Sequence, residues 1–521
     1  MTIVSLFLCI SLLCLLFTFL GSIRARRRYP PGPRGLPLVG NALQIPQDRQ
    51  WLKWAEWKGK YGIKLEWGLV GDIMRISILG TPAIILSSKR AATDLLETRG
   101  NIYSDRPTAT MAGELVGWSR GLGYAQASHN PRFRELRRLF HHFMGPRACA
   151  DPTLLHIQER ENRSLLRKLL SDPDNFDAHA RECTSSLILV LTYGYPSDAG
   201  DPLGLVKIAE KAMEGFAVAS EPGRWWVDSF PTLKYLPSWL PGTSFQQAAQ
   251  RMRVDLDKLF EIPYRYVKDE ITEGRANPSF LLSYLEVKNG QETLEEEELV
   301  QGFVQTPSAL TSFILAMVLN PEVQERAQAE IDALLAGSIR LPTFEDRDQL
   351  PYVSAIVKEV WRWNPSVPLG LPHVVTQDDE YRGYTIEKGS IVWANVWAIL
   401  HDEEIFPEPL AFRPERYLSD SGSLQTGQDD TAGSTVAAAF GFGRRICPGM
   451  HIAENSVFIA IATMLYAFRI SKPLDGQGKM QDPAVEYDGF ISHPRAFKCK
   501  IEPRSKEIEA LVRSTEFGDG H

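Results

Sequence analysis

The chain has 521 residues, of which 44% are hydrophobic, so it can bury a large core in one large domain or in several smaller ones. Its formal net charge is -7 and its body contains no long lysine and arginine tract, which argues against a nucleic-acid partner. The 6 cysteines are widely scattered, with two of them in the apolar N-terminus, and they show no disulfide framework.

The N-terminus predicts a membrane anchor. Residues 3–23 carry no charge, and about 20 such residues in a helix cross a hydrocarbon core of roughly 30 Å. Four arginines follow at once, and positive charge beside a first span stays on the cytosolic side. A cleaved signal peptide is the alternative, but these charges come after the apolar run and no small-x-small cleavage site closes it. We therefore expect a single-pass anchor at residues 1–23 and a basic, proline-rich stalk at residues 24–40.

The rest of the chain has the pattern of one mainly helical domain. A β-branched stretch at residues 73–88, interrupted at Gly80, predicts a hairpin. Residues 131–335 carry mostly helical spacing, and short extended pieces return at residues 381–396. We expect residues 41–521 to form a single large domain that is mainly α with a minor β-sheet (α+β).

An aromatic segment at residues 221–242 has two open interpretations. Its large side chains stand between prolines, and they are Trp225, Trp226, Phe230, Tyr235, Trp239 and Leu240. They can pack in the core, or they can form a surface patch that touches the bilayer beside the anchor.

The stretch "AAFGFGRRICPGMHIAE", residues 438–454, places Cys447 in a setting suited to iron. A thiolate that ligates iron needs a turn that leaves its sulfur uncrowded, and donors that offset its charge. Gly441, Gly443 and Gly449 would let the backbone approach a flat ligand closely. A helix expected to start near Pro448 would point N–H dipoles at the sulfur.

Two neighbours of the cysteine complete the pattern. Arg445 can pair with a carboxylate on the edge of a flat ligand, and Phe440 can cover the far side of the sulfur. The spacing Phe440-x-x-Gly443-x-Arg445-x-Cys447-x-Gly449 resembles, without departure, the haem-ligand signature of the cytochrome P-450 family of haem-thiolate monooxygenases. The alternative is a buried structural cysteine in a tight turn. The resemblance implies haem b with Cys447 as the axial thiolate.

A second match concerns a structural network. "KEVWRW" places Glu359 and Arg362 three residues apart on one helix face, where they can form an ion pair. "FRPERY" supplies Arg416 between that helix and the cysteine. The resemblance implies that the three residues form a network that supports the proximal face of the haem and does not take part in catalysis.

Two further matches concern the haem carboxylates. "RFRELRRLFHHF" resembles the family's Trp-Arg-x-x-Arg-Arg helix, with Phe133 where tryptophan is usual. Phenylalanine cannot donate the indole hydrogen bond, so the resemblance leaves only a guanidinium contact, from Arg137. "LPHVV" places His373 where the family often contacts a haem propionate.

The oxygen-handling segment departs from the family. The resemblance implies a long helix with a small-Gly-x-acid-Thr centre, and aligning it from Ser308 puts Val304 at the acid and Gln305 at the threonine. Gln305 and Thr306 are then the candidate catalytic proton relay, and Pro307 is expected to interrupt the helix at a cost of about 3 kcal/mol or more. Three interpretations stay open: a divergent enzyme, a variant that has lost catalysis, or a mis-spliced form that lacks about two helical turns.

The resemblance covers essentially the whole chain and is strongest to the fungal branch of secondary metabolism, which includes enzymes similar to tryptamine hydroxylases and to oxidisers of terpenoids and polyketides. It implies a monooxygenase that inserts one oxygen atom of O₂ into a lipophilic small molecule. Electrons would come from NADPH through a separate flavoprotein reductase in the endoplasmic reticulum membrane. The alternative is a haem-binding but catalytically impaired chain. Residues 367–371 and 108–123 are the candidate substrate lining.

Overall fold

The structure is a computed structural model that describes residues 28–61, 64–65, 68–128, 130–196, 201–288, 306–425, 427, 430–473 and 480–515. The predicted anchor at residues 1–23 lies outside these residues, as do Val304 and Gln305. Within the described part, only helix α18 (Met450–Ala467) is long and apolar enough to cross a membrane. Because 78% of it is buried inside the fold, it is a core helix.

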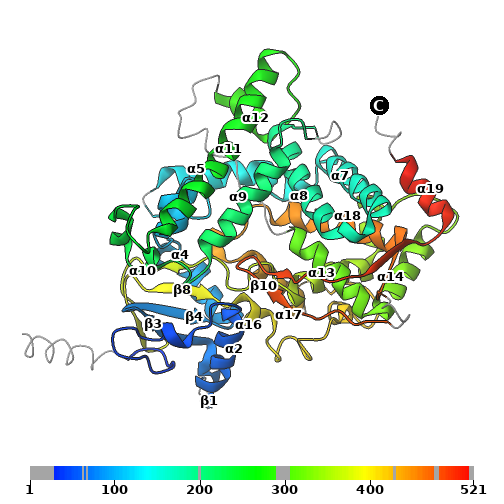
Figure 1. Cartoon of the computed structure of the whole chain (residues 1–521). Helices are drawn as coiled ribbons and strands as arrows, with labels where there is room; N and C mark the ends of the chain where they lie inside the picture. Colours follow the sequence, from blue (N-terminus) through cyan, green and yellow to red (C-terminus); the bar gives the residue numbers. More distant parts are fainter. Residues whose placement is uncertain are drawn as a thin grey trace, which may run out of the picture.

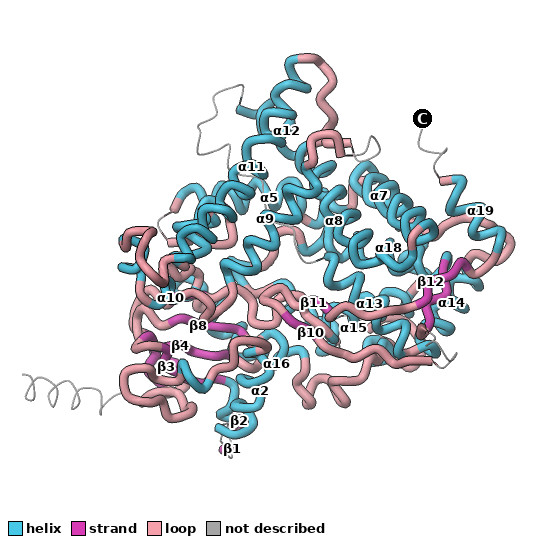
Figure 2. The backbone as a smooth tube through the Cα atoms, viewed as in Figure 1, coloured by secondary structure: helices cyan, strands magenta, loops and turns pink. Residues whose placement is uncertain are grey.

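The described residues are mainly helical, as predicted, with short strands gathered mostly at one side (Figures 1 and 2). The larger helices are α2 (Gln50–Tyr61), α5 (Pro131–Met144), α7 (Pro152–Ser171), α8 (Phe176–Tyr193), α9 (Leu205–Ser220), α11 (Ser244–Thr272), α12 (Phe280–Lys288), α13 (Thr306–Leu319), α14 (Pro321–Leu334), α15 (Pro351–Trp363), α18 and α19 (Lys506–Ser514). Short helices are α3 (Lys89–Ala92), α4 (Gly100–Tyr103), α6 (Pro146–Cys149), α10 (Trp226–Ser229), α16 (Val396–Leu400) and α17 (Thr431–Val436).

The strands form one sheet of four and several pairs. Their bounds are β1 (Lys64–Leu65), β2 (Gly68–Leu69), β3 (Ile73–Ile78), β4 (Thr81–Leu86), β5 (His373–Val374), β6 (Asp379–Tyr381), β7 (Tyr384–Ile386), β8 (Ile391–Ala394), β9 (Phe468–Ser471), β10 (Tyr487–Asp488), β11 (His493–Pro494) and β12 (Lys500–Pro503). The main sheet has the order β3-β4-β8-β5. Strands β7 and β8 confirm the extended pieces predicted at residues 381–396.

The predicted hairpin at residues 73–88 is confirmed by β3 and β4, which pair antiparallel with Ile78 opposite Thr81. The turn between them is Leu79–Gly80, with φ angles of 49° and 88°. Two consecutive positive φ angles are typical of a two-residue type I′ hairpin turn.

The described part of the proline-rich segment lies along strand β3. The Arg75 backbone N–H donates to the Pro31 carbonyl oxygen at 2.9 Å, and the Asn41 N–H donates to the Ser77 carbonyl at 2.6 Å. At Gly40, φ is +62° and an added Cβ would lie 2.2 Å from the Ser77 oxygen, so only glycine fits this approach. Backbone contacts therefore fix this segment on the sheet.

The largest core cluster surrounds α18, which packs against α7, α13, α14 and α15. Side chains on every face of this helix are buried, including Phe458, Ile461 and Leu465 at 0% exposure. A helix that is apolar all round belongs in the interior of a large domain. The loop of Cys447 leads directly into this rigid element.

One expectation stays a prediction. Helix α13 is described from Thr306 onward, and residues 289–305 lie outside the described residues. The expected interruption of a longer helix by Pro307 depends on those residues, so it is not tested by the structure.

The aromatic segment lies largely at the surface. We call Trp226, Phe230, Tyr235, Leu236 and Trp239 the aromatic patch; their exposed fractions are 66%, 42%, 78%, 40% and 79%. Trp226 and Phe230 stack with their ring centroids 6.2 Å apart. Figure 1 shows α10, which carries the start of this segment, at the edge of the molecule. Core packing is thus wrong for these five side chains.

Candidate functional site

Cys447 lies in a tight loop between the 3₁₀ turn Gly443–Arg445 and α18. Its backbone N–H donates to the Phe440 carbonyl oxygen at 2.8 Å, which closes the loop. The Phe440 ring is buried and packs against Trp361, with the ring centroids 4.8 Å apart. Helix α18 begins at Met450, two residues later than predicted.

The surroundings of the Cys447 sulfur include donors as well as apolar side chains. Burial raises the pKa of the Cys447 thiol, while a hydrogen bond from the Gly449 backbone N–H and the charge of Arg137 act in the opposite direction. A half-buried thiol with donors already facing it becomes a thiolate when a metal ion binds, because a coordinated thiol is deprotonated.

Gly443 is required by a close backbone contact. Its φ is +53°, and an added Cβ would lie 2.4 Å from the Leu96 carbonyl oxygen. This approach to the π-helix Thr93–Thr98 requires glycine, and the predicted approach to a flat ligand stays a prediction. The contact fixes the loop on one side.

Arg445 is held by backbone carbonyls. Its Nε donates to Ser104 at 2.7 Å, its Nη1 to Leu122 at 3.0 Å and its Nη2 to Ala125 at 2.5 Å. Burial, with the charges of Arg106 and Arg137 nearby, lowers the pKa of Arg445 to about 8. The only favourable charge of note is that of Asp105.

Arg106 extends this positive cluster, and His373 lies beside it. Arg106 is 5% exposed and donates to the carbonyls of Gly123, Leu371 and Pro372 at 2.8 to 3.0 Å. Burial lowers the pKa of Arg106 to about 10. The His373 Nδ1 lies 2.7 Å from the Tyr103 carbonyl oxygen, and burial with the Arg106 charge holds the His373 pKa well below its usual value.

Arg137 contacts the cysteine loop directly. Its Nη1 donates to the Ile446 carbonyl oxygen at 2.6 Å. Its neighbours Arg134 and Arg138 on α5 are exposed. Of the three arginines in the predicted helix, Arg137 is thus the one that faces the loop.

Glu359, Arg362 and Arg416 form the predicted network. Glu359 and Arg362 are completely buried and make a two-point ion pair, with N–O distances of 2.7 and 2.9 Å. Arg416 adds a contact of 3.2 Å to the same carboxylate. The Tyr417 hydroxyl and the Arg413 backbone N–H also donate to Glu359, so every oxygen of this buried carboxylate has partners.

Comparison with known proteins gives the family. The cytochrome P450 family profile matches residues 30–501. The chain belongs to the cytochrome P450 family. It is 41% identical to cytochrome P450 monooxygenase 208 of Postia placenta over 513 residues, covering 96% of this chain and 95% of the relative.

Two further relatives have similar coverage. The chain is 41% identical to tryptamine 4-monooxygenase of Psilocybe cyanescens over 497 residues, covering 93% of this chain and 94% of the relative. It is 40% identical to cytochrome P450 monooxygenase claR of Ampulloclitocybe clavipes over 512 residues, covering 96% of this chain and 91% of the relative. This chain is a P450 monooxygenase, and its family implies a haem with a thiolate ligand.

The residues of this P450 fit such a haem. Three guanidinium groups act on one another here, those of Arg106, Arg137 and Arg445, and among the described residues the carboxylate of Asp105 acts on Arg445. Asp105 is itself bound by the backbone N–H groups of Ala127 and Ser128. Buried positive charge of this kind is offset by an anionic ligand, and haem carries two carboxylates.

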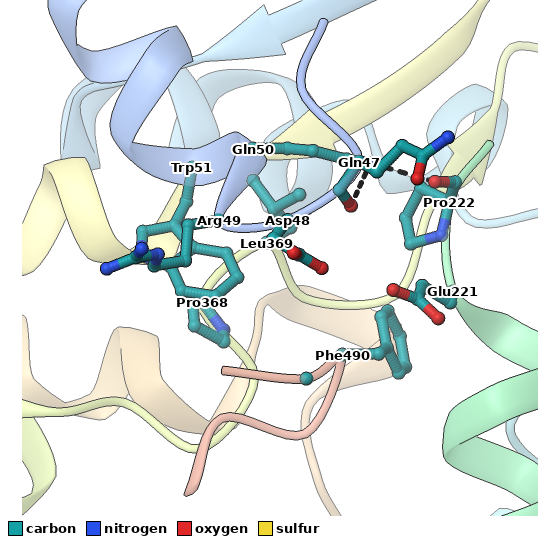
Figure 3. A pocket seen from close by; sticks show the side chains of 11 residues that line it. Gln47, Asp48, Arg49, Gln50, Trp51, Glu221, Pro222, Pro368, Leu369 and Phe490 are labelled. Carbon is teal, nitrogen blue, oxygen red and sulfur yellow. Dashed lines mark hydrogen bonds between the residues drawn. The ribbon is translucent and has the colours of Figure 1, made fainter. Parts of the chain in front are cut away.

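A narrow crevice opens near the predicted substrate lining of this P450. It lies between the start of α2, the chain at Pro222, residues 368–369 and the turn at Phe490 (Figure 3). Gln50 spans the crevice by donating its side-chain N–H to the Pro222 carbonyl oxygen at 2.8 Å. The Phe490 ring lies 6.3 Å from that of Phe216, which belongs to an apolar cluster with residues of the predicted 108–123 lining.

Sequence reasoning missed Arg106 and Tyr417 as parts of these clusters. Arg106 stands in "SDRP", and Tyr417 ends "FRPERY", the motif that supplies Arg416. Of the predicted proton relay, Gln305 lies outside the described residues and Thr306 is the first residue of α13.

Proposed function

We propose that Cys447 is the axial ligand of the haem iron in this P450. Phe440 and Gly449 frame its sulfur, and Gly443 fixes the loop. Arg137, Arg445 and His373, with Arg106, would hold the haem carboxylates. The observation that carries the proposal is the buried excess of positive charge beside a cysteine whose sulfur already accepts a backbone hydrogen bond.

Bound haem would supply the chemistry of dioxygen, in which one oxygen atom enters a C–H bond of the substrate and the other leaves as water. The residues of this chain would orient the haem, exclude water from the buried Cys447 loop and hold the substrate. The loop is held by Phe440, Leu96 and Arg137, so its shape does not depend on the ligand alone.

The substrate we propose is a lipophilic small molecule of fungal secondary metabolism, of terpenoid, polyketide or indole type. The support is the 41% identity to tryptamine 4-monooxygenase together with the apolar cluster of Met111, Val116, Trp118 and Phe216 around the predicted lining. Such a cluster suits a flat apolar ligand.

The electron source we propose is NADPH through a separate flavoprotein reductase. The support is the family itself: the P450 match occupies residues 30–501, and a P450 implies a redox partner. The body would face the cytosol at the endoplasmic reticulum membrane, held by the anchor at residues 1–23.

A second candidate is a chain that binds haem but turns over poorly. The observation that favours it is Val304 and Gln305 where the family places an acid and an alcohol, since neither can relay protons as those groups do.

We expect the full chain, co-expressed with a reductase and supplied with lipophilic indoles or terpenoids, to oxidise NADPH with release of much peroxide and little product. The double variant Val304→Asp, Gln305→Thr should raise product formed per NADPH by about tenfold, at the low end of what a positioned acid–base group contributes. Val254→Asp, an exposed site on α11, is the matched control. If the unaltered chain already couples most of its NADPH to product, this second candidate is wrong.

We further propose that the aromatic patch touches the bilayer beside the anchor. Residues 1–27 contain no tryptophan, so quenching of tryptophan fluorescence by brominated lipid reports only on the body. In vesicles that hold the full chain, the double variant Trp226→Phe, Trp239→Phe is expected to lose most of the quenchable fluorescence. The buried Trp57→Phe is the control. Quenching that is unchanged in the double variant would rule out contact through this patch.

A further inference from the structure

Phe133, where tryptophan is usual in the family, contacts Arg445 in this P450. We propose that the face of the Phe133 ring positions the Arg445 guanidinium for a haem carboxylate. Phe133 is thereby a positioning residue. The inference rests on the proposed function, because it takes the haem beside Cys447 as given.

The geometry is that of a buried cation–π pair. The Arg445 Cζ lies 4.1 Å from the centroid of the Phe133 ring, and Phe133 is 4% exposed. A guanidinium over an aromatic face at this distance is attracted by the ring quadrupole, and the attraction grows when both groups are shielded from water. The ring therefore holds the plane of the guanidinium in one orientation.

The hydrogen bonds of Arg445 leave donors for a ligand. A guanidinium has five N–H groups, and one each from Nε, Nη1 and Nη2 goes to the carbonyls of Ser104, Leu122 and Ala125. One N–H therefore remains on each terminal nitrogen. Two such groups in a fixed plane match the two oxygens of a carboxylate.

Phe133 acts together with Arg137 on the same helix. The two residues are four apart on α5, which places them on one face. Arg137 donates to the carbonyl of Ile446, while Phe133 covers Arg445. One face of α5 thus contacts Arg445 and Ile446, the two residues that immediately precede Cys447.

A side chain that only fills space would not replace this contact. Leucine and methionine can occupy most of the volume of the ring, but they present no negative π face to a cation. Arg445 lies in a cluster of like charges with Arg106 and Arg137. Loss of the ring would leave its orientation to the three backbone carbonyls alone, against the repulsion of the two other guanidinium groups.

The test is the rate at which haem leaves the full-length holoprotein, measured as transfer to excess apomyoglobin. We expect Phe133→Leu to speed haem loss about tenfold, which corresponds to about 1.4 kcal/mol. Phe133→Trp, which keeps an aromatic face, should restore a rate within about threefold of the original, because tryptophan gives the strongest cation–π contact. If Phe133→Leu does not accumulate, Phe133→Met takes its place, and the same acceleration of haem loss is expected for it.

The matched control is Phe140→Leu on the same helix. Phe140 is 2% exposed and stacks on Phe280 with the ring centroids 5.7 Å apart, and among the described residues no cation lies over its ring. The Phe140→Leu variant should have a lower midpoint of urea unfolding and a nearly unchanged rate of haem loss. Equal haem loss in Phe133→Leu and the original protein, or an equal acceleration by Phe140→Leu, would overturn the inference. Either result leaves the thiolate spectrum of the original protein intact, whereas absence of that spectrum would refute the proposed function itself.

Discussion

Replacing Glu359 with alanine is expected to stop the protein from accumulating as a folded, haem-containing P450. The substitution leaves Arg362, at 0% exposure, without its carboxylate, and also removes the partner of Arg416. Breaking a buried ion pair by removing one partner costs about 3–5 kcal/mol. Because a domain has only about 5–15 kcal/mol of stability in total, a large part of that margin is lost. The measurements are the midpoint of urea unfolding and the haem-to-protein ratio of the purified protein.

The matched control uses another glutamate that pairs with arginine within one helix. Glu261 pairs with Arg265 on α11 at 3.5 Å, but the two side chains are 64% and 75% exposed. Exposed pairs contribute about 0–1 kcal/mol, so Glu261→Ala should leave both quantities nearly unchanged. If Glu359→Ala and Glu261→Ala behave alike, the network does not support the fold as argued.

Replacing Cys447 with alanine is expected to remove the haem while leaving the polypeptide folded. The loop keeps its backbone bond from residue 447 to Phe440, its contact at Leu96 and its bond from Arg137, none of which needs the sulfur. Only the proposed iron ligand is lost. The haem-to-protein ratio after gel filtration should fall at least about tenfold, because the iron–thiolate bond is the proposed protein ligand of the metal. Turnover should be abolished.

Cys183→Ala separates this effect from the loss of any cysteine. Cys183 is also partly buried against the main core cluster, where its thiol faces the Glu161 carbonyl at 3.7 Å. This variant should retain its haem. Retention of haem by Cys447→Ala at the level of Cys183→Ala would refute the ligand assignment.

Much of this architecture could be predicted because local pattern and structure agree. The hairpin at residues 73–88 follows from β-branched residues on both sides of Gly80, and the Glu359–Arg362 pair follows from helical spacing. The frame of Cys447 follows from a motif confined to ten residues. In each case the partners lie close together in the chain.

The rest depends on contacts between distant segments. Arg445 finds its carbonyl partners at Ser104, Leu122 and Ala125, over 300 residues away, and Gly443 is needed because of Leu96. No local pattern shows such a contact. The prediction for Pro307 stays a prediction because the residues before Thr306 lie outside the described ones. The orientation of the aromatic patch stayed open because hydrophobicity alone does not tell a core side chain from an exposed one.

The central claim, that Cys447 binds the haem iron as a thiolate, is tested most directly by the absorption spectrum of the reduced protein under carbon monoxide. The original chain and Cys183→Ala are expected to show the strongly red-shifted band of a thiolate-ligated haem, and Cys447→Ala is expected to lack it. The same band in Cys447→Ala, or an unshifted band in the original chain, would contradict the claim.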